Sequence, residues 1–393
     1  MKRVIADTSF NYFVSGALAL IIPLLLLERE VNVAEIGVVL SVYPLIFLSA
    51  RLLFAAIADR VGWGHVFAVI NWPAAFFSTL IYFLASSTFG FFVGKIVEAL
   101  RESSYWAANR TAIFSLSPNR EEREATRINA VIWFSTAGGS AVAGVGIAYI
   151  GFSSTLLVLI FASAVMGVPA LALWKQGAAF SRKTEKPSRT AVSLSPGGRN
   201  RTFWRVSIAL LFYSLATYPL ITLLLPVFMD QQLRYNYLSI GAAFMLYNVI
   251  AALVTLVSLK KPVNRARALL QSVIGLVASF LLASSGVYFL ALFLALAVQR
   301  GLGIGFFESI VAKVTKNNPT VSVDIGWLHV PTRLAEFFSV LTAGFVAQYL
   351  GYVPVFAASG VAFVGFSILS LGIVKQDHLQ ETPKKTRTLN TLY

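Results

Sequence analysis

Ionisable residues gather in one stretch of an otherwise apolar sequence, residues 94–110. Lys95, Glu98, Arg101 and Glu102 all lie there within two helical turns. At about 100° per residue, a helix would bring six side chains to one face, with Arg101 beside them: Lys95, Glu98, Glu102, Tyr105, Trp106 and Asn109. Carboxylates beside cations in a low-dielectric site can hold a polar solute and exchange protons. The stretch is therefore a candidate site for substrate binding and proton coupling.

A second charged face is predicted near the C-terminus of the chain. His329, Arg333 and Glu336 are spaced i, i+4, i+7, which places them on one side of a helix, and Arg300 lies alone in another apolar run. These residues complete the candidate substrate and proton-coupling set. The structural alternative is that Glu98 with Arg101, and Arg333 with Glu336, are ion pairs that only hold their helices together.

The composition excludes an ordinary soluble enzyme. The chain has 393 residues, of which 57% are hydrophobic and 12% are charged, and its mean hydropathy is +0.74; soluble domains carry about 25% charged residues. The net charge of +15 is spread over short gaps between apolar runs, which is typical of membrane anchors and not of a nucleic-acid surface. With no cysteine and three histidines, neither a metal site nor a cofactor is expected.

Apolar runs of about 20 residues, the length that crosses a bilayer, recur along the chain. We expect an all-α integral membrane protein with twelve transmembrane helices, at residues 5–27, 34–57, 65–85, 89–115, 127–150, 153–174, 204–228, 236–259, 266–285, 287–313, 323–349 and 353–374.

A basic, Pro- and Ser-containing segment divides these runs into two sets of six. We expect a six-helix bundle over residues 1–175, a cytoplasmic linker over 176–202, a second six-helix bundle over 203–374 and a cytoplasmic tail over 375–393. Lys and Arg concentrate in the linker and in alternate gaps. This positive-inside bias predicts a multi-pass protein of the cell (plasma) membrane with both termini in the cytoplasm.

The two sets of six also share a weak internal repeat. Ala143-Gly144, Tyr149 and Gly151 recur 200 positions later as Ala343-Gly344, Tyr349 and Gly351. The repeat indicates two parallel, pseudo-symmetric six-helix bundles, an arrangement that places a substrate site near mid-membrane between them.

The gap after the second run reads Ala-Ala-Ile-Ala-Asp-Arg-Val-Gly-Trp-Gly over residues 55–64. It resembles the signature loop of the major facilitator superfamily, Gly-x-Leu-Ala-Asp-Arg-x-Gly-Arg-Arg/Lys, which lies at the same place between spans two and three. Asp59, Arg60 and Gly62 match, whereas Trp63 and Gly64 replace the two basic residues. The resemblance implies a gating motif here, in which Asp59 would cap the start of the run over 323–349.

The resemblance also implies a function. It predicts a secondary active transporter that moves a small organic solute by alternating access. The mixed charges of Lys95, Arg101, Arg300 and Arg333 favour a polar or anionic solute. No Gly-x4-Gly-Lys-Ser/Thr loop occurs, so we expect coupling to an ion gradient, with protons as the ion. The alternative is a proton-driven exporter of drugs or hydrophobic metabolites, which aromatic residues such as Trp133 and Tyr247 would suit.

Neither His-x-x-x-His nor Gly-x-Ser-x-Gly occurs, so no enzyme is predicted. The expected partners are the solute, protons and the lipid bilayer, and no nucleic acid is expected to bind. The chain is expected to be a monomer.

Overall fold

The computed structural model describes residues 1–117, 121–181, 199, 201–258, 265–282, 284, 286–315 and 321–380. Helices make up almost all of these residues, and no strand occurs among them. The core is apolar and lies between the helices, as expected for an all-α membrane protein.

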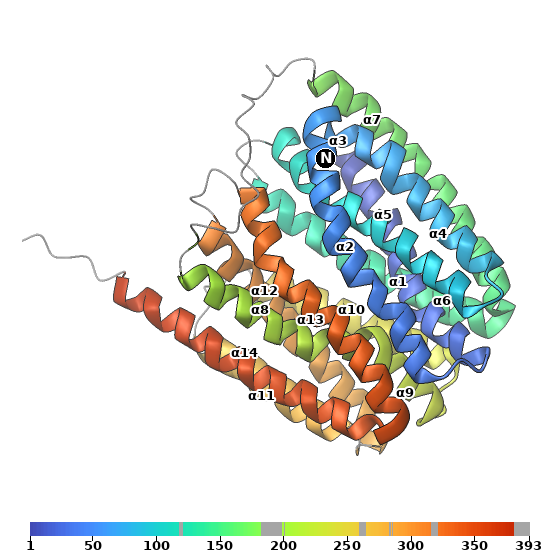
Figure 1. The fold of residues 1–393 in the computed structure, drawn as a ribbon, viewed down its shortest axis with the longest axis vertical. Coiled ribbons are helices and arrows are strands. Elements are labelled where there is room, and N and C mark those ends of the chain that lie inside the picture. Colours follow the sequence, from blue (N-terminus) through green and yellow to red (C-terminus); the bar gives the residue numbers. More distant parts are fainter. Residues whose placement is uncertain are drawn as a thin grey trace, which may run out of the picture.

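Six passes come from the first half of the chain (Figure 1). The helices are α1 (Lys2–Glu28), α2 (Val33–Val61), α3 (Trp63–Val66), η1 (Phe67–Asn71), α4 (Trp72–Leu84), α5 (Thr88–Leu116), α6 (Glu121–Val165) and α7 (Gly167–Ser181). The third pass combines α3, the π-helical turn η1 and α4. The long α6 holds the fifth pass and, after a sharp turn at Gly151, the start of the sixth, which α7 completes.

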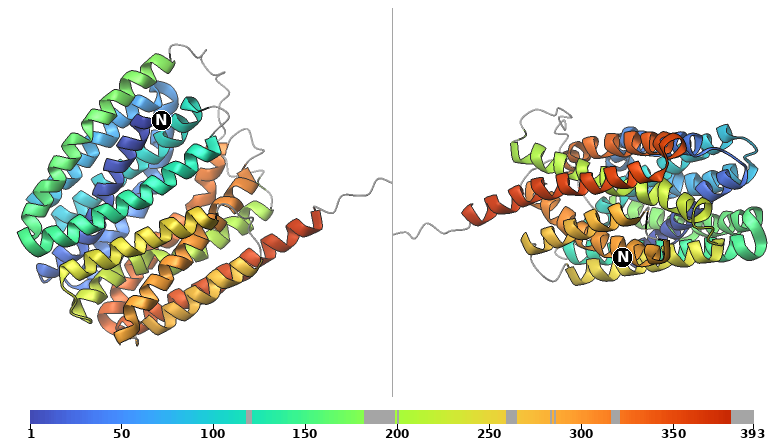
Figure 2. Two further views of the ribbon diagram at one scale, coloured as in Figure 1. Left: turned by 180° about the vertical axis from the view of Figure 1, so that it is seen from behind. Right: turned by 90° about the horizontal axis from the view of Figure 1, so that it is seen from below.

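Six further passes come from the second half. The helices are α8 (Arg201–Pro219), η2 (Leu220–Leu224), α9 (Leu225–Gln231), α10 (Tyr237–Ser258), α11 (Arg265–Leu282), η3 (Gly286–Tyr288), α12 (Phe289–Thr315), α13 (Val321–Leu350) and α14 (Tyr352–Gln380). Together α8, η2 and α9 form the seventh pass. Figure 2 shows the two groups of helices side by side.

In the described part of the chain, nine helical segments are long and apolar enough to cross a membrane. One of them, Arg127–Gly177, holds two passes. The remaining two passes are α5, which carries four ionisable residues within two turns, and α11, whose apolar part is short. The twelve predicted spans are therefore confirmed. The spans α5 and α11 are less apolar or shorter than the other ten, because α5 carries charged residues and α11 has a short apolar part.

Local sequence signals set the ends of α2, the helix that lies between the charged helices of the two halves. Asn32 caps its first turn, because the Asn32 side-chain oxygen accepts a hydrogen bond from the Glu35 amide at 2.9 Å. Gly62 ends it with φ at +92°, a conformation that favours glycine. The Gly62 of the signature loop thus has a backbone role at the end of α2.

The two halves meet along two pairs of helices, α2 against α13 and α6 against α10. A Cβ added to Gly144 of α6 would lie 2.6 Å from the Cα of Gly241 in α10, and one added to Gly37 of α2 would lie 3.0 Å from the Cα of Gly344 in α13. The first distance is closer than real Cβ contacts, and at the second crossing a Cβ added to Gly344 would lie 2.8 Å from the Val33 carbonyl oxygen, so these helices touch through their backbones. Glycine is required at both crossings.

The residues of the internal repeat have the same structural role in each half. Gly151 and Gly351 turn the chain with φ at +78° and +83°, and Gly144 and Gly344 both pack against the other half. The predicted pseudo-symmetry is confirmed by these positions.

Both crossings lie near one end of the molecule, which we call the distal end and define by residues 29–32, 232–236 and Gly351. Here the Val33 amide donates to the Gln348 side chain at 2.9 Å, and the Tyr237 hydroxyl donates to the Glu28 carboxylate at 2.8 Å. Each hydrogen bond joins the two halves. A polar cavity of about 400 Å³ lies at the same end, lined in part by Glu30.

Replacing Gly144 by Leu should force the two halves apart at the distal end, because the new side chain has no room beside Gly241. The chain has no cysteine, so Glu28→Cys with Tyr237→Cys would report the separation by disulfide cross-linking. We expect slower cross-linking in the Gly144→Leu background. Gly372→Leu is the matched control, since an added Cβ there meets nothing within 4 Å. Equal rates in both backgrounds would contradict the prediction.

Candidate functional site

Glu98 of α5 is the centre of a buried group of charges. Its carboxylate lies 2.8 Å from the Lys95 ammonium and 3.9 Å from the Arg101 guanidinium. The Tyr82 hydroxyl, from α4, donates to the same carboxylate at 2.6 Å. Lys95 and Glu98 are each 5% exposed and Arg101 is fully buried. Two cations thus share one carboxylate, which leaves this group with one excess positive charge.

Arg101 is directed into its own half of the molecule. Its guanidinium donates to the Ser15 hydroxyl of α1 at 2.6 Å, and its backbone carbonyl accepts a hydrogen bond from Asn71 in η1 at 2.9 Å. Among the described residues, its Nε and Nη1 atoms have no hydrogen-bond partner.

Glu102 faces α1 as well, but without a cation. Its carboxylate accepts hydrogen bonds from the Tyr12 hydroxyl at 2.6 Å, the Trp106 indole at 2.9 Å and the Asn11 amide at 3.5 Å. One turn further along α5, the Tyr105 hydroxyl shares a hydrogen bond with Thr8 at 2.9 Å. Three neutral donors therefore satisfy the oxygens of the Glu102 side chain.

In the other half, Arg333 and Glu336 of α13 form an ion pair of 2.6 Å. The Ser214 hydroxyl of α8 donates to the second Glu336 oxygen at 3.1 Å. His329 lies one turn before Arg333 and is half-buried. His329, Arg333 and Glu336 therefore lie on one helix, as predicted. Glu336 accepts a hydrogen bond from a neighbouring helix of the same half, α8.

An aromatic pair on α2 links the two charged helices. The Lys95 ammonium lies 5.8 Å from the Tyr43 ring centroid, and the Arg333 guanidinium lies 4.1 Å from that of Phe47. The Tyr43 and Phe47 rings are stacked 6.3 Å apart. Lys95 of α5 and Arg333 of α13 thus both point towards α2, which packs between these two helices. Cations of both halves meet on one aromatic surface.

Arg300 of α12 lies at the second contact between the halves. Its guanidinium is 4.9 Å from the Trp133 ring of α6 and 5.9 Å from the Tyr247 ring of α10. Among the described residues, no carboxylate comes within ion-pair distance of it, in contrast to Lys95, Arg101 and Arg333. A cation between two aromatic faces, without its own anion, is suited to an anionic ligand.

The structure also places the remaining predicted residues. Asn109 is 2% exposed and lies on α5 one turn after Tyr105. Arg60 is exposed at the end of α2. The side chains of Asp59 and of residues 321–325 lie outside the described set, so the predicted cap of α13 falls there too.

Sequence reasoning did not identify several partners. Tyr82 and Tyr12 donate hydrogen bonds to carboxylates of α5, and Ser15 accepts one from Arg101. One signal was present for the α2 aromatics, because Tyr43 and Phe47 are spaced i, i+4 on one helix face.

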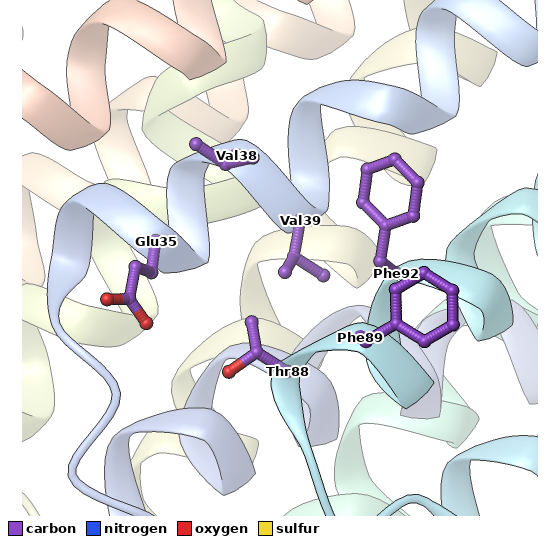
Figure 3. Close-up of a pocket in the computed structure, with 6 residues that line it drawn as sticks. All are labelled: Glu35, Val38, Val39, Thr88, Phe89 and Phe92. Carbon is purple, nitrogen blue, oxygen red and sulfur yellow. The ribbon is translucent and has the colours of Figure 1, made fainter.

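A separate cavity of about 320 Å³ opens between α2 and α5 (Figure 3). It is lined by Glu35, Val38 and Val39 from α2 and by Thr88, Phe89 and Phe92 from α5. Its walls are apolar apart from Glu35 and Thr88, and Phe89 is exposed on the outer face of the bundle. This cavity is not part of the charged site.

Comparisons with known proteins agree with this arrangement. The family model of the Major Facilitator Superfamily matches residues 8–319. No curated protein sequence matches the chain. Two solved structures of a bacterial homologue of the human lysosomal transporter Spinster are similar in fold. The inward-facing, occupied one has a TM-score of 0.67 at 15% identity, covering 96% of each chain. The inward-facing, unoccupied one has a TM-score of 0.72 at 13% identity, covering 95% of this chain and 96% of the other.

Replacing Glu98 by Gln should destabilise the protein strongly, because Lys95 and Arg101 then lose their only carboxylate partner among the described residues. Removing one member of a buried ion pair costs about 3–5 kcal/mol. Denaturation of the purified protein in detergent would measure the loss. Glu30→Gln, at an exposed carboxylate, should change the unfolding free energy by about 0.5 kcal/mol or less. A loss no larger than that of the control would show that the group is not a buried ion pair.

Proposed function

Since the chain belongs to the major facilitator superfamily, we propose that this secondary transporter moves a small polar or anionic organic solute by alternating access. As a member of this family it is a multi-pass membrane protein and a transporter, not an enzyme. The observation that carries the proposal is the convergence of cations from both halves on aromatic rings at the boundary between them. A solute bound at this boundary would contact both halves, as alternating access requires.

The charge balance supports an anionic solute. Of the charged residues proposed to bind the solute, four are cations, Lys95, Arg101, Arg300 and Arg333, and three are carboxylates, Glu98, Glu102 and Glu336. The ion pairs leave Arg300 without a carboxylate within ion-pair distance among the described residues. A carboxylate or phosphate group bound at Arg300 would neutralise the excess charge, while Trp133 and Tyr247 would pack against the rest of the solute.

The proton coupling proposed for the transporter is supported by the three carboxylates of the same site. Each lies next to a side chain that a solute could displace, and a proton would replace the lost partner. His329 would extend this relay on α13. Asp59, Arg60 and Gly62 would control opening at the end of α2.

The proposed topology follows the positive-inside bias. Both termini and the linker over 176–202 lie in the cytoplasm, with the bundles over 1–175 and 203–374 in the plasma membrane and the tail over 375–393 after them. The distal end then faces outwards. The proposed working unit is one chain, because the site is built from the two halves of a single chain.

Replacing Arg300 by Gln should weaken the binding of an anionic solute by about 10- to 100-fold, the loss expected for one charge-assisted hydrogen bond. Arg300→Lys should retain part of the affinity, because the charge remains. A thermal-shift screen of metabolites on the purified protein would find the ligand and measure both variants. Arg205→Gln, at an exposed arginine of α8, is the matched control and should bind like the wild type.

Transport itself is tested in reconstituted vesicles. We expect uptake of the solute found in the screen to accelerate under an imposed pH gradient. Efflux of cationic dyes, without flux of any anionic or polar solute, would support the exporter of drugs or hydrophobic metabolites instead. An anionic ligand whose affinity is the same in Arg300→Gln and in the wild type would overturn the assigned site.

A further inference from the structure

The polar cavity at the distal end is lined by both halves of the molecule, and we call it the distal cavity. Its volume is about 400 Å³, and small-molecule sites have volumes of about 300–1,000 Å³. Glu30 and Asn32 line it from the connection between α1 and α2, and Gln231, Gln348 and Tyr352 line it from the C-terminal half. None of these residues belongs to the proposed solute site. The distal cavity is therefore a separate space that a small ligand can fill.

Hydrogen bonds within the protein fix two carboxamides of its wall. The Tyr352 hydroxyl donates to the side-chain oxygen of Gln231 at 2.7 Å, and the Val33 amide donates to the side-chain oxygen of Gln348 at 2.9 Å. These bonds set which end of each carboxamide is the oxygen. Among the described residues, the side-chain nitrogens of Gln231 and Gln348 have no acceptor. Each nitrogen is thus the group left for a ligand.

Glu30 supplies a hydrogen-bond acceptor to the same cavity. Among the described residues, its carboxylate has neither a cation nor a hydrogen-bond donor. The neighbouring Arg29 donates to the Ala85 carbonyl instead, and the Asn32 side chain donates to Glu35 at 2.8 Å. The distal cavity therefore combines one uncompensated carboxylate with N–H donors from the other half.

The backbone of Glu30 is held in an unfavourable conformation. Its φ is +60°, and its amide bonds back to the Leu27 carbonyl at the end of α1 at 2.8 Å. Glycine is the commonest residue at such a helix end, because a side chain is disfavoured there. A glutamate in this position costs conformational energy, which points to a role for its carboxylate.

The chemistry of the wall selects among classes of ligand. An anion would be repelled by Glu30. An amine would bind Glu30 but leave the N–H groups of Gln231 and Gln348 without acceptors, which is unfavourable once water is displaced. A hydroxyl group both donates and accepts. A molecule with several hydroxyls can therefore donate to the carboxylate and accept from both carboxamides.

We propose that the distal cavity binds a neutral polyhydroxylated solute of the sugar class, which joins the two halves and keeps the distal end closed. The ligand contacts Glu30 in one half and Gln231 and Gln348 in the other, so it loses contacts when the halves separate. A ligand that binds one state better shifts the equilibrium towards that state. The bound polyol would thus inhibit transport without occupying the solute site. Only this inhibition rests on the proposed function, because it requires the distal end to open during transport.

The binding test uses the purified full-length protein with D-glucose, D-mannose, D-galactose and myo-inositol. At least one of them should raise the melting temperature saturably, whereas general stabilisation by excluded osmolytes does not saturate. Glu30→Gln should weaken the apparent affinity by about 10- to 100-fold, the loss expected for a hydrogen bond to a charged group. Glu35→Gln is the matched control and should bind like the wild type, because this exposed carboxylate lines the other cavity.

A second variant separates loss of the ligand from loss of folding. Glu30→Gly relieves the positive φ at this position, so without ligand it should melt no lower than the wild type. Its affinity for the polyol should nevertheless fall at least as far as that of Glu30→Gln, because the carboxylate is gone.

The conformational test measures the rate of disulfide cross-linking between Glu28→Cys and Tyr237→Cys, whose native side chains bond across the halves at the distal end. The polyol found in the panel should accelerate this cross-linking. Glu30→Gln should abolish the acceleration at the same polyol concentration. Arg300→Gln should leave it unchanged, because Arg300 belongs to the solute site.

The proposal is overturned if no member of the panel binds saturably, if affinity is equal in Glu30→Gln and the wild type, or if cross-linking does not accelerate. A polyol that enters reconstituted vesicles and whose binding is lost in Arg300→Gln would be the transported solute, which would also overturn the distal site. Vesicles that carry no solute would instead overturn the proposed function, while the binding and cross-linking results would stand.

Discussion

The structure depends on one constraint, namely that each charge placed among membrane helices needs a partner close by. Glu98 meets this constraint for Lys95 and Arg101, and Glu336 meets it for Arg333. Each carboxylate also accepts a hydrogen bond from a neighbouring helix, from Tyr82 in one half and Ser214 in the other. The ion pairs thus fix the packing of α5 against α4 and of α13 against α8, and they make each half a coherent unit.

The contacts between the halves are of another kind. Among the described residues, every buried ion pair lies within one half. The boundary has glycine crossings, arginines over aromatic rings and two hydrogen bonds at the distal end. Breaking a cation–π contact costs about 0.5–2 kcal/mol, whereas stranding one partner of a buried ion pair costs about 3–5 kcal/mol. The halves can therefore separate without leaving a carboxylate unpaired. This difference is what a transporter that rocks two rigid halves requires.

The sequence predicted the helices well because length and apolarity determine whether a segment spans a bilayer. The structural alternative, in which Glu98 pairs with Arg101 and Glu336 with Arg333, follows from the sequence because residues three positions apart on a helix are neighbours. Both contacts occur, and Lys95 lies closer to Glu98 than Arg101 does. It did not predict that Arg101 would bond to Ser15, or that α2 would lie between α5 and α13. The rotation of a helix and the choice of its neighbours are set by packing among all the helices. Gly144 and Gly344 are an exception, because the internal repeat in the sequence identifies them as equivalent positions, and both lie at a contact between the halves.

The buried acids differ in what holds them. Glu98 and Glu336 have cationic partners, and Glu102 has three neutral donors. The oxygens of these three acids therefore have partners within the protein. Asp7 has neither a cation nor a hydrogen-bond donor among the described residues. The Asn11 amide, one turn from Asp7 on α1, donates to Glu102 at 3.5 Å, so the two kinds of acid lie at the same contact between α1 and α5.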